Sequence, residues 1–144
     1  TEGPKLIEYN CRFGDPECQA LMVRLKSDAL DMLLAAAEGR LINITPKWSP
    51  DTALTVVMAT KGYPGHYEKG SEIKGLEEVE RIEGITVFHA STGYKKGKTT
   101  AQGGRVLNIT AIAPTAKEAQ EKAYEAIKKI DWDLESEERP PQHR

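Results

Sequence analysis

Polar and apolar residues alternate near the start of the chain and then follow a helical period. Residues 5–12 alternate one by one, which is the pattern of a β-strand with one polar and one apolar face. From Pro16 to Glu38, leucine, methionine and alanine recur every three or four residues, which predicts one amphipathic helix. Asp15 is expected to cap the start of this helix, and Gly39 is expected to end it.

The rest of the chain has the pattern of strands followed by a last helix. Apolar, β-branched runs predict strands, which lie at residues 53–60, 72–74, 85–90 and 104–113. Thr115 and Glu118 have the spacing of a capping box, and the apolar stripe behind them predicts a helix to about Ile130. Short links between the strands, including a hairpin turn at residues 95–97, favour antiparallel pairing. The expected fold class is α+β, with a mostly antiparallel sheet and helices on one side.

Composition changes along the chain and indicates where domains meet. Residues 43–52 hold two prolines and several turn-forming residues, so they are interpreted as a connector. This predicts a boundary between an N-terminal part, residues 1–42, and a compact domain, residues 43–133. Residues 134–144 are charged and carry adjacent prolines, and they are expected to form a disordered tail.

Charge and hydropathy limit the possible partners. The 144 residues are 39% apolar and 29% charged, with a formal net charge of −2, which is typical of a soluble globular protein. We therefore expect no nucleic-acid or membrane partner, and a cytoplasmic location, because there is neither a long apolar run nor a signal-peptide pattern. Cys11 and Cys18 are interpreted as free thiols. Because the chain opens on Thr1, it is interpreted as a segment of a longer protein.

Three polar residues with different chemistry share one face of the first predicted strand. Glu8, Asn10 and Arg12 are two positions apart, and such residues project from the same side. A carboxylate and an amide oxygen suit Mg²⁺, and an adjacent arginine suits a phosphate or a carboxylate. The alternative is a half-exposed strand whose outer face is simply polar.

Two other segments could contact a small substrate. Lys61 and Gly62 open a loop, "KGYPG", that combines a cation with a flexible backbone, although an ordinary tight turn would have the same composition. Gly103 and Gly104 would allow a ligand to approach the backbone, and Arg105 could bind a sugar phosphate. The alternative for these three residues is the entry to a strand, with a surface arginine.

Several motifs in a fixed order resemble one enzyme family. The segments are "LIEYNCRFGDPECQ", "ALTVVMATKGYPGHYEKGSEIKG", "VFHAST" and "GGRVLNITAIA". Together they resemble the phosphoribosylamine–glycine ligase family, from the end of its ATP-grasp domain through its C-terminal domain. The resemblance extends from about residue 3 to about residue 132, which is almost the whole chain.

The resemblance implies an ATP-dependent carbon–nitrogen ligase of purine biosynthesis. Its substrates would be ATP, glycine and 5-phosphoribosylamine, and its products ADP, phosphate and glycinamide ribonucleotide. Glu8 and Asn10 would be the ligands of Mg²⁺ or Mn²⁺, and Arg12 would be the catalytic residue that steadies the acyl phosphate and the attacking amine.

The family has further parts before these motifs, and they carry the nucleotide pocket. The resemblance therefore implies a C-terminal portion that is inactive alone, with the missing N-terminal portion as its partner. Two alternatives remain open: a stand-alone module that binds substrate or regulates without catalysis, and one half of a split ligase.

Overall fold

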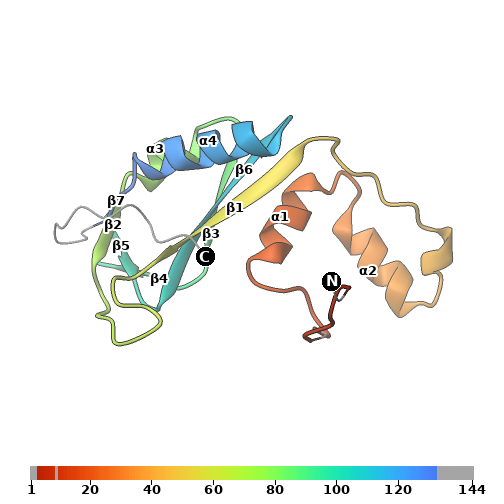
Figure 1. Ribbon diagram of the computed structural model, residues 1–144, viewed down its shortest axis with the longest axis horizontal. Helices are drawn as coiled ribbons and strands as arrows, with labels where there is room; N and C mark the ends of the chain where they lie inside the picture. The colour runs from red at the N-terminus through yellow and green to blue at the C-terminus, as the bar shows by residue number, and fades with distance from the viewer. Residues whose placement is uncertain (1–2, 9, 133–144) are drawn as a thin grey trace.

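The fold consists of antiparallel sheets, with helices packed against them and a smaller helical part at the N-terminus (Figure 1). The computed structural model describes residues 3–8 and 10–132. The strands are β1 (Thr52–Ala59), β2 (Glu72–Lys74), β3 (Ile85–His89), β4 (Thr92–Lys95), β5 (Lys98–Ala101), β6 (Arg105–Ala113) and β7 (Asp131–Trp132). The helices are α1 (Glu17–Arg24), α2 (Ala29–Ala37), the 3₁₀ turn η1 (Leu41–Asn43), α3 (Leu76–Glu80) and α4 (Ala116–Ile127).

Within the described residues the strands form two antiparallel sheets. The first has the order β1-β6-β3 and the second the order β4-β5-β2-β7. β1 and β6 pair along their whole length, from Thr52 opposite Ala113 to Ala59 opposite Arg105. This arrangement confirms the predicted α+β class and its antiparallel pairing, whereas the division into two sheets and the strands β4, β5 and β7 were not predicted.

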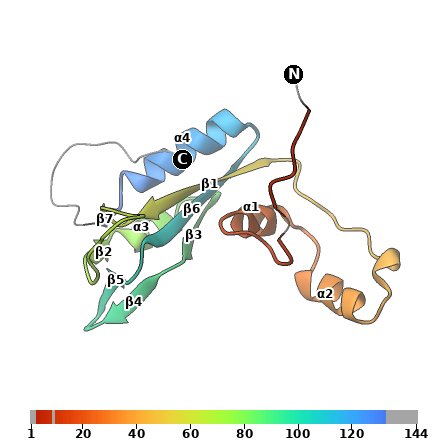
Figure 2. The same cartoon turned by 60° about the horizontal axis from the view of Figure 1, so that its bottom comes forward.

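Strand β6 is the centre of the core. Val106, Leu107 and Ile109 on this strand are fully buried, as are Ala119 and Ala123 on α4. Alanines on the inner face of α4 let the helix approach the sheet closely. At the start of α4, Thr115 and Glu118 form the predicted capping box. Helices α4 and α1 both contact β1 and β6, and they lie on opposite sides of β1 in two views (Figures 1 and 2).

The hairpin between β4 and β5 turns as the sequence predicts. Lys96 and Gly97 both have positive φ, 51° and 77°, as the central residues of a two-residue hairpin turn require. The turn places Lys95 opposite Lys98 in the antiparallel pair.

The prediction of one helix from Pro16 to Glu38 is wrong. Helix α1 ends at Arg24, and α2 begins after Asp28, whose side chain accepts a hydrogen bond from the backbone N–H of Leu30. Between them, Leu25 is extended and forms an isolated bridge with Trp48. The extended backbone of Leu25 pairs with Trp48 in the connector, and this pairing competes with continuation of the helix. The helical spacing of apolar residues carries no information about such a distant contact.

The prediction of a strand at residues 5–12 is also wrong. Residues 3–8 and 10–13 have no strand structure, and none of the described strands pairs with them. An alternating sequence is compatible with a strand, but a strand also needs a neighbour for its backbone hydrogen bonds. Pro16, rather than Asp15, occupies the cap position of α1, and no side chain caps that helix.

The ends of two helices can be compared with the predictions. Helix α4 ends at Ile127, three residues before the predicted end, although Ile130 still contributes to the core. Gly39 has a left-handed φ of 69° and follows α2, as a helix-ending glycine should. Helix α2 lies beyond α1 as seen from the sheet (Figure 1). Its Leu30, Leu33 and Leu34 are exposed. The predicted boundaries at residues 43 and 133 stay predictions, and residues 134–144 lie outside the described part.

Gly75→Ala should destabilise the fold markedly. Gly75 has a left-handed φ of 82°, and an added Cβ would lie 2.3 Å from the backbone oxygen of Lys129. We expect a loss of about 2 kcal/mol or more in the free energy of unfolding, measured by urea denaturation. Gly97→Ala is the matched control, because its φ of 77° is similar but its surroundings are open. Equal losses in the two variants would contradict the expected clash.

Candidate functional site

A small hollow at the N-terminal end brings the predicted metal and catalytic residues together. Its volume is about 240 Å³, and it is lined by Glu8, Asn10, Arg12, Gly14, Asp15, Pro16 and Glu17. The segment is not a strand, yet the three residues singled out for their spacing all face this one space. Three carboxylates and one guanidinium line it, so it offers ligands for a cation and a donor for an anion.

Glu8 and Asn10 lie side by side and could supply two oxygen ligands to a divalent cation. The Nδ2 atom of Asn10 donates to Oε1 of Glu8 at 3.4 Å, so the two side chains already adjoin. Rotating the Asn10 amide would present its oxygen beside the Glu8 carboxylate, and hard oxygen ligands are those that Mg²⁺ and Mn²⁺ prefer. Within residues 3–8 and 10–132, no three His, Cys, Asp or Glu side chains group closely enough to hold a metal. A cation would therefore complete its shell with water or phosphate oxygens.

Arg12 keeps most of its guanidinium available. Its Nη1 atom donates to the backbone oxygen of Phe13 at 2.9 Å, and the residue is exposed. A guanidinium has five N–H donors, so several remain for an anionic group in the hollow.

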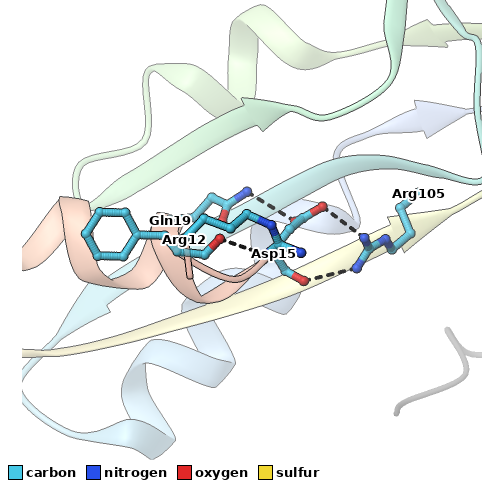
Figure 3. A network of polar contacts seen from close by, with 5 residues as sticks. Arg12, Asp15, Gln19 and Arg105 are labelled. Atoms are coloured by element: carbon cyan, nitrogen blue, oxygen red, sulfur yellow. Dashed lines mark hydrogen bonds and ion pairs between the residues drawn. The ribbon is translucent and has the colours of Figure 1, made fainter. Parts of the chain in front are cut away.

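Asp15 connects the hollow to the sheet (Figure 3). Its Oδ2 atom lies 3.0 Å from Nη2 of Arg105, and its backbone oxygen accepts from Nη1 of Arg105 at 3.1 Å. Gln19 donates from Nε2 to Oδ1 of Asp15 at 3.4 Å. Arg105, predicted to contact a sugar phosphate, thus binds a carboxylate on the rim of the hollow.

The two predicted substrate loops lie against each other. Thr60, next to Lys61, donates from its side chain to the oxygen of Gly103 at 2.7 Å and from its backbone to the oxygen of Gly104 at 2.8 Å. An added Cβ on Gly104 would lie 2.2 Å from the ring of Tyr63. The close approach that this glycine allows is therefore to the protein's own tyrosine. Lys61, Gly62, Gly103 and Gly104 do not line the hollow.

Comparison with known proteins identifies the larger part of the chain. Residues 53–136 match the family described as phosphoribosylglycinamide synthetase, C domain. The chain belongs to this family. The match confirms the resemblance drawn from the sequence motifs.

Named relatives extend the similarity to the N-terminal part. The chain is 58% identical over 132 residues to phosphoribosylamine–glycine ligase of Brucella melitensis, covering 92% of the chain and 31% of that protein. It is 56% identical over 131 residues to the chloroplastic phosphoribosylamine–glycine ligase of Arabidopsis thaliana, covering 90% of the chain and 25% of that protein. The chain thus spans about a third or less of the length of these relatives.

A solved structure supports the fold. The crystal structure of phosphoribosylamine–glycine ligase from Thermotoga maritima superposes with a TM-score of 0.67 at 31% sequence identity. The superposition covers 90% of this chain and 31% of that one, so it includes residues outside the matched C domain as well.

Sequence reasoning missed two acidic residues of the hollow. Asp15 was assigned to a helix cap, but its carboxylate faces Arg105 instead. Glu17 was read only as part of a helix, but its Oε1 accepts from the backbone N–H of Gly14 at 2.8 Å and so closes the turn beside the hollow. The motif "FGDPE" places both acids close to Arg12, and this spacing is the signal that could have marked them.

A second, larger hollow belongs to the phosphoribosylglycinamide synthetase C domain. Its volume is about 590 Å³, and β2, α3 and the β4–β5 hairpin line it. Nζ of Lys98 lies 2.7 Å from a carboxylate oxygen of Glu72, and this hydrogen bond holds the pKa of Glu72 below its ordinary value. The helices of the described residues are a separate matter: none of them is long and apolar enough to cross a membrane.

Lys98→Met should raise the pKa of Glu72 towards its ordinary value. The lowered pKa means that the pair stabilises the fold above the ordinary pKa of Glu72 and that this contribution is lost as pH falls through the lowered value. A carboxyl ¹³C NMR titration measures the change. Glu78, whose pKa is lowered by a hydrogen bond from Lys129, is an internal control that should not move. An unchanged Glu72 titration would contradict the expected coupling.

Proposed function

We propose that the chain is the C-terminal portion of a phosphoribosylamine–glycine ligase and supplies one edge of its active site. The reaction is ATP + glycine + 5-phosphoribosylamine → ADP + phosphate + glycinamide ribonucleotide. The observation that carries the proposal is the hollow in which Glu8, Asn10 and Arg12 meet, in a chain that matches this ligase family.

Glu8 and Asn10 would hold Mg²⁺ or Mn²⁺ through their side-chain oxygens. A cation bound there would offset negative charge on the phosphates of ATP. Arg12 would donate hydrogen bonds to the phosphoryl oxygens of glycyl phosphate, which forms when the glycine carboxylate takes the γ-phosphoryl group. The amine of 5-phosphoribosylamine then attacks the glycyl carbonyl, and phosphate leaves. The role of these residues is to neutralise charge and to position the reacting groups.

The two substrate loops, at residues 61–62 and 103–105, form the proposed contact with the ribose phosphate substrate. Lys61 supplies a cation, and Gly62 has a left-handed φ of 94° that shapes the loop. Gly103 and Gly104 hold this loop through their carbonyl oxygens. Arg105 has two of its donors on Asp15, so a direct contact with phosphate would use those that remain.

The remaining partner is the portion of the ligase that the chain does not match. The relatives are more than three times as long as the matched part, and the nucleotide pocket of the family would lie in the remainder. We also propose that the protein works in the cytoplasm on small molecules.

An assay of the chain alone and in a chimera tests the proposal. The isolated chain, mixed with ATP, Mg²⁺, glycine and 5-phosphoribosylamine, should release no ADP above background. A chimera in which the chain replaces the matching 31% of the Brucella melitensis ligase should release ADP in a glycine-dependent manner. Turnover by the isolated chain, or a folded chimera without activity, would contradict the proposal. Activity on mixing the chain with the unmatched portion would instead identify a split ligase.

A further inference from the structure

Arg105 and Asp15 join two parts of the chain that are 90 positions apart. The guanidinium contacts the Asp15 carboxylate at 3.0 Å and its backbone oxygen at 3.1 Å (Figure 3). We infer that Arg105 is a positioning residue for the cation hollow: it holds Asp15, and through Asp15 it fixes the turn that lines the hollow together with Glu8, Asn10 and Arg12. The inference deepens the proposed function and rests on it.

A β-bulge directs Arg105 towards the hollow. Met58 pairs with Leu107 and Ala59 pairs with Arg105, so Val106 is an extra residue in β6. A bulge changes the direction in which the neighbouring side chains point and is common beside functional sites. The bulge is anchored, because Val106 is fully buried and the oxygen of Gly104 accepts from the backbone of Thr60. Arg105 therefore reaches out from a rigid base.

The receiving side is a short turn held by local hydrogen bonds. The backbone oxygen of Gly14 accepts from the N–H of Cys18 at 3.0 Å, and its N–H donates to Glu17. Asp15 is next in the chain. One oxygen of its carboxylate accepts a hydrogen bond from Gln19, and the other pairs with the guanidinium of Arg105. Gly14, Asp15 and Glu17 all line the hollow, so a shift of this turn changes the shape of the cation site.

The ion pair is too exposed to contribute much to global stability. The side chains of Arg105 and Asp15 are 41% and 46% exposed, and exposed pairs contribute little to the free energy of unfolding. Two-point contact by a planar guanidinium nevertheless restricts geometry more than a single lysine contact would. A positioning role thus predicts a local change without a global loss.

The sign of the effect separates positioning from simple electrostatics. Removing the positive charge of Arg105 would by charge alone strengthen the binding of a cation in the hollow. If Arg105 positions the site, its removal should instead weaken cation binding. Arg105→Met removes both the positive charge and the two-point contact of the guanidinium. Arg105→Lys keeps the charge but loses the two-point contact.

The test uses the 144-residue chain and needs no activity. NMR spectra of the ¹⁵N-labelled chain report the backbone amide of Gly14 and the side-chain amide of Asn10, and Mn²⁺ affinity is measured by electron paramagnetic resonance. Arg105→Met should shift both amide resonances, lower Mn²⁺ affinity about two- to fivefold, and leave the thermal midpoint within a few degrees. In an Asp15→Asn background the same substitution should have a smaller effect, because the two residues act together.

Lys129→Met is the matched control. It removes another exposed ion pair, in which Nζ lies 2.7 Å from Glu78, far from the hollow in sequence, and should leave Gly14, Asn10 and Mn²⁺ affinity unchanged. The inference is overturned if Arg105→Met moves the two resonances no more than this control, or if it strengthens Mn²⁺ binding. Failure of the unmodified chain to bind Mn²⁺ would count against the proposed cation site, while the amide resonances would still decide the role of Arg105.

Discussion

Glu8→Gln in the chimeric ligase is expected to lower kcat/KM about 100-fold, because one charged ligand of the cation is lost. Glutamine keeps the length and the oxygen of the side chain but removes its negative charge. Asn10, whose Nδ2 atom lies 3.4 Å from Oε1 of Glu8, is uncharged, so it cannot replace the lost negative charge. The loss should be partly reversed by raising the Mn²⁺ concentration, which a coupled ADP-release assay measures.

Glu121→Gln is the control for the loss of one carboxylate. Glu121 is exposed on α4 and pairs with Lys117 at 3.8 Å, away from the hollow. This variant should retain the activity of the chimera. If Glu8→Gln were as active as Glu121→Gln at low Mn²⁺ concentration, Glu8 would not be a cation ligand.

Leu107→Ala should be among the most destabilising single substitutions in the chain. Leu107 is fully buried on β6, where it pairs with Met58 on one side and His89 on the other. Truncation removes buried apolar surface and leaves a cavity, for which we expect a loss of about 2–5 kcal/mol. Urea denaturation followed by circular dichroism gives the free energy of unfolding.

Leu33→Ala makes the same chemical change at an exposed site. Leu33 lies on α2 and is 62% exposed, and alanine is at least as good a helix former. Its effect should stay within about 0.5 kcal/mol. A similar loss for both leucines would mean that β6 is not the centre of the core.

Local signals explain which parts of the fold could be predicted from the sequence. The strands β1, β3 and β6 are runs rich in apolar and β-branched residues, and the capping box of α4 lies within four residues. The break between α1 and α2 depends on the contact of Leu25 with Trp48, so no helical period could reveal it.

The candidate site was predictable in composition but not in geometry. The alternation of Glu8, Asn10 and Arg12 placed three side chains on one side, and they do line one hollow although no strand forms. The contact of Arg105 with Asp15 joins residues that chain composition cannot connect. It depends on the bulge in β6, which is a product of strand register.

Helix α1 has a consequence for shortening the protein. The connector is tied to α1 by hydrogen bonds from Lys26 to Lys47 and from Ser49 to Arg24, and α1 itself rests on β1 and β6. A protein that begins at residue 43 would therefore lose the cover over one face of its main sheet, even though residues 53–136 match a family by themselves. The unit of inheritance and the unit of folding differ here, and exchanging this domain between ligases would require α1 to travel with it.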